Sequence, residues 1–193
     1  MPQNTRRIIG LDVDGVLLDF VGHTVQTMRA RGFTMREPEE YKGWSLQSAM
    51  PPEQAVILPA LWRAPGWCSW MPALPGAVAF VRDLRCWGEV VFVTSPMPDA
   101  PHWHHERTRA LSGLFGARAG EVIFTHRKDL VSCDVLIDDK IEHVNDWSMR
   151  HARRGAILFE TPHNVLDRAG KVLHPLALAV SGYSAVLDEM ERP

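Results

Sequence analysis

Apolar positions along the chain fall into two patterns: short continuous runs, and longer segments in which apolar residues recur at helical spacing. The short runs are typical of buried strands, and the longer segments are typical of amphipathic helices. We therefore predict strands at Arg7–Leu11, Glu89–Val93, Val122–Thr125, Asp134–Ile137 and Ala156–Phe159. We predict helices at Ala77–Trp87, Pro101–Phe115, Ile141–Ala152 and Leu176–Met190. This alternation predicts an α/β protein with a three-layer, doubly wound, mostly parallel sheet.

One interval departs from the alternation. Between the first strand and Pro75 the chain runs for about sixty residues, rich in Trp and Pro, which is more than a crossover between parallel strands needs. We predict that residues 19–73 form a small inserted helical cap, and that residues 1–18 and 74–193 form the α/β core. The aromatic residues of the insertion either build the core of the cap, or line a cleft and stack on a planar ligand.

Two carboxylates one residue apart follow the first predicted strand. Asp12 and Asp14 come directly after an apolar run, and the chain turns at Gly15. Open α/β sheets bind ligands at the carboxyl ends of their strands, and the two carboxylates can converge there. Crowded carboxylates repel one another unless a cation or a shared proton joins them. The pair predicts a metal site with a candidate nucleophile, or else an ordinary turn built from Asp and Gly.

Polar side chains also follow the later predicted strands. Thr94 and Ser95 come after the second strand, and two hydroxyls at a turn suit a phosphoryl oxygen. Lys128 follows the third strand and can neutralise phosphate charge. Asp138 and Asp139 follow the fourth, and adjacent buried carboxylates are costly without a cation or donors. Each could be an ordinary loop residue, but together they supply the parts that phosphoryl transfer needs.

Two other classes of protein share parts of this pattern. An EF-hand loop needs a third ligand, then glycine and glutamate at its sixth and twelfth positions, where the chain has Val16, Leu17 and His23. A phospho-accepting receiver domain carries its accepting aspartate after the third strand, where the chain has Thr125-His126. The sequence excludes the first class and disfavours the second.

Composition and charge narrow the functional classes further. The 193 residues suit one domain with an insertion, and 46% hydrophobic and 23% charged residues are ordinary for a soluble globular protein. A net charge of −2 without a basic run argues against a nucleic-acid polymer as partner. No stretch approaches the ~20 apolar residues of a membrane span, and the residues before Asp12 hold too few for a signal peptide. Three cysteines without CxxC spacing are typical of reduced thiols, so we expect a cytoplasmic protein.

Several stretches in a fixed order point to a known family. They are Asp12-Val-Asp14-Gly15-Val16-Leu17 with Asp19-Phe20, Leu74-Pro75-Gly76-Ala77-Val78, Val91-Phe92-Val93-Thr94-Ser95-Pro96, Lys128, Val131-Ser132, Asp134-Val135-Leu136-Ile137-Asp138-Asp139, Ile157-Leu158-Phe159 and His163-Asn164. This order resembles the haloacid dehalogenase-like phosphohydrolases, and within them the 5'(3')-deoxyribonucleotidase family. The Asp-x-Asp and Ile-Asp-Asp elements are shared by many relatives, whereas Thr-Ser-Pro and the late His-Asn are more particular to nucleotidases.

The resemblance implies roles for the carboxylates. Asp12 would attack phosphorus and form an aspartyl-phosphate, and Asp14 would protonate the leaving oxygen and then activate water. The implied cofactor is Mg²⁺, held by an Asp12 oxygen, the Asp14 backbone carbonyl and Asp139. The second aspartate of the late pair is the ligand in the family pattern, so Asp138 would lie behind the metal ligands.

The resemblance also implies the residues that hold the substrate. The phosphoryl oxygens would be held by Thr94, Ser95 and Lys128. Aromatic residues under the cap would line the pocket for the nucleobase, at positions that correspond to Phe20, Trp44, Trp62 and Trp67.

Two departures from the family pattern limit these expectations. The segment Met97–His105 does not carry the family's usual residues, and its His102, His104 and His105 suggest either a second metal or, as we expect, a solvated loop that runs into a helix. The segment Gly43-Trp44-Ser45 fits the family only with a gap. Because the cap sets base preference and the choice between 5' and 3' esters, these are not predicted.

We predict a Mg²⁺-dependent phosphomonoesterase that acts on deoxyribonucleoside monophosphates. One alternative is a phosphatase of the same superfamily that acts on another small phosphomonoester. The other is a nucleotide-binding or receiver-like protein without turnover. The expected partner is a small-molecule nucleotide. Family members are often dimers, so a homodimer is compatible with the resemblance, although the sequence carries no interface signal.

Overall fold

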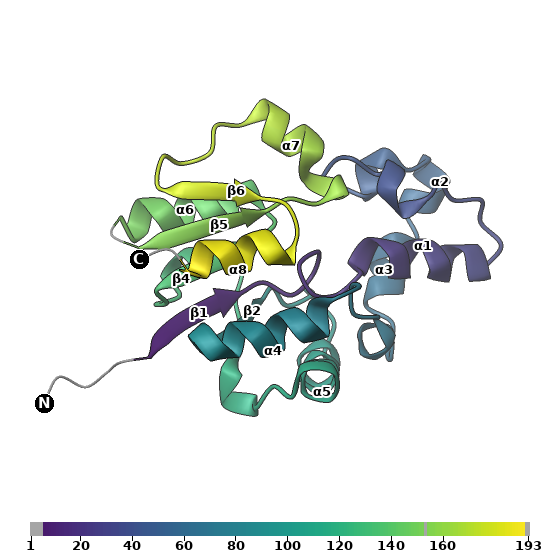
Figure 1. Cartoon of the computed structure of the whole chain (residues 1–193). Helices are drawn as coiled ribbons and strands as arrows, with labels where there is room; N and C mark the ends of the chain where they lie inside the picture. Colours follow the sequence, from purple (N-terminus) through teal and green to yellow (C-terminus); the bar gives the residue numbers. More distant parts are fainter. Residues whose placement is uncertain (1–5, 153, 192–193) are drawn as a thin grey trace, which may run out of the picture.

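A six-stranded parallel sheet forms the centre of the computed structural model, which describes residues 6–152 and 154–191 (Figure 1). The sheet has the order β3-β2-β1-β4-β5-β6, and all of its strand pairs are parallel. Its strands are β1 Arg7–Leu11, β2 Gly88–Thr94, β3 Val122–Phe124, β4 Val135–Asp138, β5 Gly155–Phe159 and β6 Ala177–Val180. The first five match the predicted strands to within one residue at each end. Part of the prediction about a signal peptide falls on residues 1–5, which lie outside the described residues.

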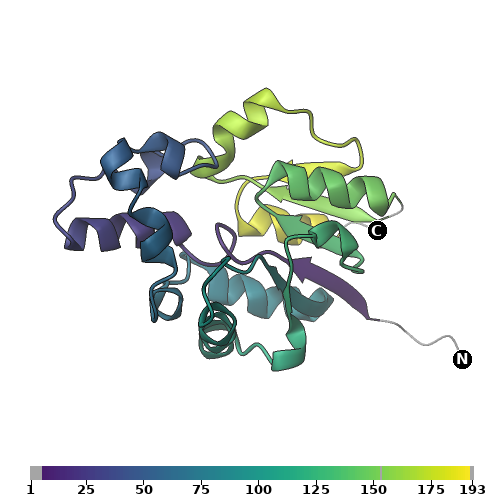
Figure 2. The same ribbon diagram turned by 180° about the vertical axis from the view of Figure 1, so that it is seen from behind.

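Helices cover both faces of the sheet. Helices α4 and α8 pack together on one face, and α6 packs against β4 and β5 on the other (Figures 1 and 2). The eight α-helices of the described residues are α1 Phe20–Ala30, α2 Pro52–Ala55, α3 Leu58–Trp62, α4 Ala77–Trp87, α5 Trp103–Phe115, α6 Ile141–Arg150, α7 Val165–Gly170 and α8 Tyr183–Glu191. The predicted three-layer α/β fold is therefore confirmed.

The predicted helix at Leu176–Met190 is wrong in its first half. Residues Ala177–Val180 form strand β6 at the edge of the sheet, paired with β5. The chain then turns at Gly182, whose φ of +81° favours glycine, and only then begins α8. A short apolar run reads equally well as a strand or as a helix segment, and here the free edge of β5 decides the outcome.

The inserted segment leaves and re-enters the core through a narrow neck. The backbone N–H of Asp19 donates to the Pro72 carbonyl at 2.9 Å, and the N–H of Leu74 donates to the Leu17 carbonyl at 2.8 Å. Between these crossing bonds lie α1, α2, α3 and three short 3₁₀-helices, and no described residue of this segment joins the sheet. The division into a core and a cap at residues 19–73 stays a prediction, which this neck supports.

One hydrophobic cluster extends from the sheet into the inserted segment. It includes Leu11 and Phe92 from the strands, and Met28, Leu58 and Trp67 from the insertion. The insertion is thus packed against the core rather than tethered to it, which fixes the wall that it builds above the strand ends. Among the described helices, none has the length and apolar character of a membrane span.

Candidate active site

The candidate site lies where β1 ends, at the point at which the sheet changes its winding direction. Strand β1 has β2 on one side and β4 on the other, so chain connections leave it in opposite directions. Such a switch point is where doubly wound sheets bind ligands. The backbone N–H of Asp12 continues the ladder by donating to the Ile137 carbonyl at 2.9 Å, which brings Asp12 beside Asp138.

A tight loop after β1 turns the chain back beneath the site. The N–H groups of Leu17 and Leu18 both donate to the Val13 carbonyl, at 2.8 and 2.9 Å. Gly15 has a φ of +80°, and a Cβ at this position would collide with the Asp139 carboxylate. Only glycine satisfies both conditions without strain, so the predicted turn at Gly15 has a physical basis.

Asp12 is buried and carries hydrogen bonds on one oxygen. Its Oδ1 accepts from the Val13 N–H at 2.6 Å and lies 2.5 Å from the Lys128 ammonium. Its Oδ2 accepts no hydrogen bond from the part of the chain that the structure describes. Burial, and next the negative charge of Asp138, raise the pKa of Asp12 from 3.8 to about 7, although Lys128 opposes this rise.

Lys128 lies between two buried carboxylates. Its Nζ is 2.5 Å from Asp12 and 2.7 Å from Asp138. Burial by itself would lower the pKa of Lys128, but these two carboxylates hold it above its ordinary value, so the amine stays charged. The loop after the third strand therefore delivers a cation to the site, as the sequence predicts.

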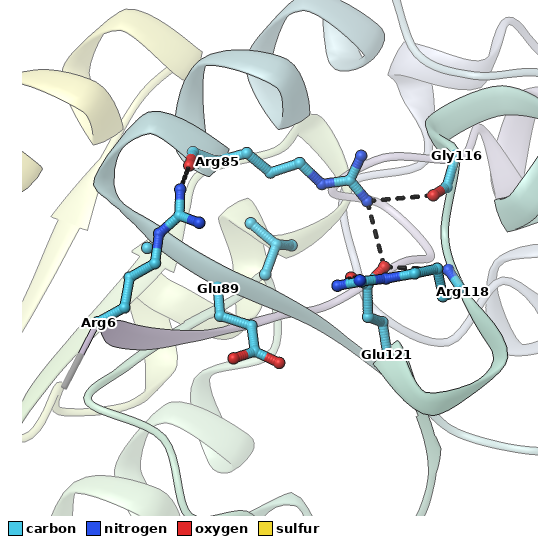
Figure 3. Close-up of a pocket in the computed structure, with 8 residues that line it drawn as sticks. Arg6, Arg85, Glu89, Gly116, Arg118 and Glu121 are labelled. Atoms are coloured by element: carbon cyan, nitrogen blue, oxygen red, sulfur yellow. Dashed lines mark hydrogen bonds and ion pairs between the residues drawn. The ribbon is translucent and has the colours of Figure 1, made fainter.

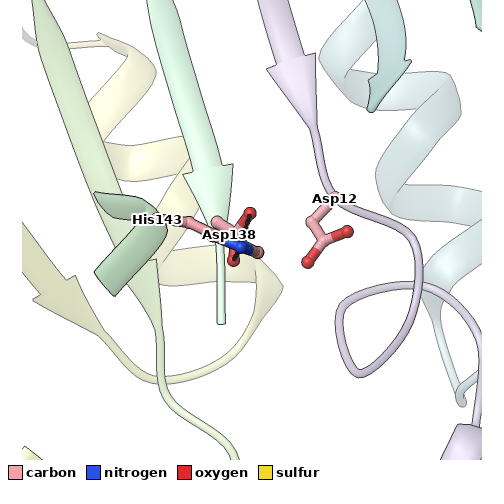
Figure 4. Close-up of side chains that lie close together, drawn as sticks. All are labelled: Asp12, Asp138 and His143. Carbon is pink, nitrogen blue, oxygen red and sulfur yellow. Dashed lines mark hydrogen bonds and ion pairs between the residues drawn. The ribbon is translucent and has the colours of Figure 1, made fainter. Parts of the chain in front are cut away.

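Asp138 is fully buried, and both of its oxygens are engaged. Oδ2 accepts from Lys128 Nζ at 2.7 Å, Oδ1 accepts from the Lys140 N–H at 2.9 Å, and His143 Nδ1 lies 3.2 Å from both (Figure 4). Burial would raise the pKa of Asp138, but Lys128 and His143 hold it well below its ordinary value. Asp138 is thus an ionised group that anchors Lys128. His143 was not predicted from the sequence, although its place in the first turn of the helix after Asp138 gave a signal.

Asp139 is buried but lacks the donors that its neighbour has. Its Oδ1 is buried without a hydrogen-bond partner among the described residues. Burial, followed by the charges of Asp12 and Asp138, raises the pKa of Asp139 well above its ordinary value. Its backbone carbonyl is fixed by Asn164, whose Nδ2 donates to it at 2.7 Å.

These carboxylates fit a divalent cation. Ligand atoms of Asp12, Asp138 and His143 lie within 4.8 Å of one another, but a metal there would have to displace Lys128 from Asp138. A metal between Asp12 and Asp139 would instead give the orphaned Asp139 oxygen a partner. Hard oxygen ligands are those that Mg²⁺ and Ca²⁺ prefer. Of the described carboxylates, Asp12 and Asp139 are thus a pair that could hold such a cation without displacing Lys128 from Asp138.

Asp14 faces a different cation from the one that faces Asp12. One terminal nitrogen of Arg107 donates to both Asp14 oxygens, at 2.7 and 2.9 Å. The Arg107 side chain is fully buried, whereas that of Asp14 is 28% exposed. Arg107 was not predicted from the sequence. Its spacing from Trp103 and Leu111 puts all three residues on one face of α5, so an arginine on the buried face was the available signal.

The carboxylates open into a cleft of about 410 Å³ beneath the inserted segment. This volume lies in the range of small-molecule sites. Its lining includes eight of the predicted site residues: Asp12, Asp14, Phe20, Trp44, Trp62, Ser95, Lys128 and Asp139. Unpredicted lining residues include Met97, Trp103, His126 and His143. The cleft is therefore polar at the strand ends and aromatic on the side of the insertion.

The predicted aromatic residues are placed unequally around this cleft. Phe20 and Trp62 form its wall, with ring centroids 5.3 Å apart, and Trp44 is 42% exposed, with the Lys140 ammonium 5.2 Å from its ring centre. Trp67 is buried behind the wall, where it packs edge-on against Phe20 and does not line the cleft. Trp67 therefore supports the aromatic wall of the cleft from behind.

Thr94 and the histidines of the segment after Ser95 also lie outside the cleft lining. Thr94 is fully buried at the end of β2, and its hydroxyl has no hydrogen-bond partner among the described residues. The histidines of the segment after Ser95 lie at the start of α5, where His104 packs against the Phe124 ring at 4.4 Å. The described residues bring three metal-ligating side chains together at Asp12, Asp138 and His143, away from this segment.

A second cavity of about 340 Å³ lies where β1 and β2 begin, at the opposite end of the sheet (Figure 3). Its arginines are already engaged. Arg6 donates to the Arg85 carbonyl, Arg85 donates to the Phe115 and Gly116 carbonyls, and Arg118 pairs with Glu121. These hydrogen bonds and ion pairs connect the ends of secondary-structure elements. The carboxylates and Lys128 of the candidate site lie at the other end of the sheet.

Residues 6–170 match the family described as "5' nucleotidase, deoxy (Pyrimidine), cytosolic type C protein". The chain belongs to this family. A relative from Bordetella pertussis named "Putative 5'(3')-deoxyribonucleotidase" is 32% identical over 164 residues, which cover 81% of this chain and 85% of the relative. A relative of the same name from Staphylococcus epidermidis is 26% identical over 164 residues, covering 84% and 88%. The resemblance to this family is thereby confirmed.

Solved structures show the same fold. A haloacid dehalogenase-like hydrolase from Burkholderia xenovorans aligns with a TM-score of 0.64 at 17% identity, covering 98% of this chain and all of the other. An HAD-hydrolase from Bacillus subtilis, bound to magnesium, aligns with a TM-score of 0.60 at 14% identity, covering 97% and 100%. The family member is thus a phosphomonoester hydrolase with a haloacid dehalogenase-like fold.

Proposed function

We propose that the chain is a Mg²⁺-dependent phosphatase of deoxyribonucleoside 5'(3')-monophosphates that works through an aspartyl-phosphate on Asp12. The observation that carries the proposal is the difference between the two oxygens of Asp12. Asp12 has one oxygen fixed by Lys128 and Val13 and the other without a hydrogen bond, at the floor of the cleft. A carboxylate held in this way is oriented for in-line attack on phosphorus.

The first step transfers the phosphoryl group to the protein. Asp12 Oδ2 forms a bond to phosphorus as the bond from phosphorus to the ester oxygen breaks, and the electron pair stays on that oxygen. Asp14 gives its proton to the departing oxygen, so a neutral alcohol leaves. Asp14, now a carboxylate, takes a proton from water as the water oxygen forms a bond to phosphorus. The bond between phosphorus and Asp12 Oδ2 breaks, its electron pair returns to the Asp12 carboxylate, and inorganic phosphate leaves.

The charge of the phosphoryl group needs cations in a site rich in carboxylates. Lys128 supplies one, and Ser95, whose hydroxyl donates to the Thr125 carbonyl at 3.4 Å, lines the same cleft. The Thr94 hydroxyl lacks a partner, which supports a role for Thr94 just behind the phosphoryl group. When bound by Asp12, Asp139 and the Asp14 carbonyl, Mg²⁺ supplies the remaining neutralisation of negative charge.

The aromatic wall supports a nucleoside as the leaving group. Phe20, Trp62 and Trp44 offer ring faces in the same cleft as the carboxylates. Nucleobases stack on such faces, and each stacked base contributes about 1–3 kcal/mol. A sugar phosphate has no flat aromatic group to stack on these rings, so the wall favours nucleotides over the alternative of another small phosphomonoester.

Phosphate release from a panel of substrates tests the proposal. Deoxyribonucleoside 5'- and 3'-monophosphates, ribonucleotides and sugar phosphates are each compared with Mg²⁺ and with EDTA. We expect release from deoxyribonucleotides with Mg²⁺ and little with EDTA. Release from sugar phosphates alone would contradict the substrate class, and full activity in EDTA would contradict the cofactor. Asp12→Asn is expected to abolish turnover, and a variant with substantial activity would rule out Asp12 as nucleophile.

A further inference from the structure

Arg107 is fully buried and binds the carboxylate of Asp14, the proposed general acid. The guanidinium of Arg107 donates to both oxygens of Asp14, and its carbon lies 4.8 Å from the centre of the Trp103 ring. Its other terminal nitrogen lies 3.9 Å from the sulfur of Met71, in the inserted segment. Asp14 is the one carboxylate paired with Arg107 among the described residues.

Packing alone does not account for an arginine at this position. The neighbours of Arg107 on the buried face of α5 are apolar, among them Trp103, Ala110 and Leu111. A buried ion pair is often no more stabilising than apolar side chains of similar volume. Arg107 also leaves its Nε buried without a hydrogen-bond partner in the described chain. We therefore relate the charge of Arg107 to its ion pair with Asp14 rather than to the stability of α5.

The geometry points to Arg107 as the positioning residue for the proton transfer at Asp14, an inference that rests on the proposed function. The Asp14 carboxylate has Arg107 on one side and the cleft on the other, and it is the less buried partner of the pair. A short side chain at the rim of a cleft would otherwise sample several rotamers. Anchoring both oxygens fixes the rotamer of the carboxyl group at the edge of the cleft, and such pre-orientation is a large part of catalysis.

The step in which Arg107 takes part is the departure of the ester oxygen. The bond between phosphorus and that oxygen breaks, its electron pair stays on the oxygen, and the Asp14 proton moves to it. Asp14 ends as a carboxylate that remains bound by Arg107. Esters whose leaving oxygen is basic need this proton, whereas 4-nitrophenolate leaves without it.

A series of phosphate esters with leaving groups of different basicity tests the inference. The value of kcat/KM reports the steps through leaving-group departure, so it is measured with Mg²⁺ for 4-nitrophenyl, phenyl and alkyl phosphates. For Arg107→Met we expect a loss of about 10²-fold with the alkyl ester and less than about threefold with the 4-nitrophenyl ester. Arg107→Lys keeps a charge in place and is expected to give an intermediate dependence on leaving-group basicity.

Two further variants separate the possible outcomes. Asp14→Asn is expected to show the same steep dependence as Arg107→Met, and the double variant is expected to be no worse than Asp14→Asn alone. Arg109→Met, on the exposed face of α5, is the matched control and should match the wild type.

An equal loss of kcat/KM for all esters in both Arg107 variants, or no loss in either, would overturn the inference. If Asp14→Asn itself leaves the dependence on leaving-group basicity unchanged, the proposed role of Asp14 fails first. If Asp14→Asn steepens it and neither Arg107 variant does, only the inference about Arg107 fails. If Arg107→Met does not fold, Arg107→Lys gives the same two outcomes.

Discussion

Asp12→Asn is expected to stabilise the metal-free protein while it removes the proposed activity. Three buried carboxylates, Asp12, Asp138 and Asp139, lie near the buried ammonium of Lys128. Asparagine keeps an oxygen that can accept from Lys128 and from the Val13 N–H, but it removes one negative charge from this crowded site. Active sites commonly trade stability for function in this way.

The size of the effect follows from the pKa of Asp12. Because the pKa rises from 3.8 to about 7 on folding, keeping this carboxyl ionised in the folded state costs on the order of 4 kcal/mol at pH 8. A folded pKa above the unfolded value means that the contribution of Asp12 to stability is fully present below pH 3.8. It is lost as the pH rises through about 7. The advantage of Asp12→Asn should therefore shrink from about 4 kcal/mol at pH 8 to about 2 kcal/mol at pH 5.

Urea unfolding in EDTA, followed by circular dichroism between pH 5 and pH 8, measures this difference. Saturating Mg²⁺ at pH 8 should stabilise the wild type more than the variant, since the metal relieves the same repulsion. Asp146→Asn, at an exposed position, is the control and should leave the free energy of unfolding unchanged. A variant that is less stable than the wild type at pH 8, or an advantage that does not change with pH, would refute the reasoning.

Three further predictions follow from local geometry. Gly15→Ala should lower the free energy of unfolding by about 1–3 kcal/mol and impair turnover, because the φ of residue 15 is +80° and an added Cβ would collide with the Asp139 carboxylate. Unchanged stability of this variant would contradict the prediction. Trp44→Ala should raise KM for nucleotides several-fold without raising KM for an alkyl phosphate, which has no ring to stack. Trp70→Ala, 80% exposed outside the cleft, should change neither. Iodoacetamide at pH 8 should label exposed Cys86 but not Cys68, because burial raises the pKa of the Cys68 thiol to about 12; mass spectrometry of the folded protein checks this.

The strand ends were predictable because parallel strands impose their geometry on the residues that follow them. Asp12, Lys128 and Asp139 come from three separate segments, yet each follows a short apolar run. In a parallel sheet the ends of such runs meet at one edge. Sequence spacing alone therefore brought these side chains together before any contact was known.

Residues that reach the site from helices were not predictable in the same way. Arg107 and His143 lie on α5 and α6, and both contact a carboxylate of the site. A polar residue in a helix normally faces solvent, so residue type alone gives no reason to expect either side chain at the site. The order of secondary-structure elements could not reveal these contacts, because they depend on which face of each helix meets the sheet.

The inserted segment shows where sequence reasoning about specificity ends. Four aromatic residues were candidates for the base, and composition does not distinguish them. In the structure Phe20, Trp44 and Trp62 face the cleft, while Trp67 supports the wall from behind. The difference arises from packing of short helices that have no repeating spacing to read, so a single residue shift would exchange a lining ring for a buried one. The chemistry of the site thus depends on the regular sheet, and its selectivity depends on the least regular part of the chain.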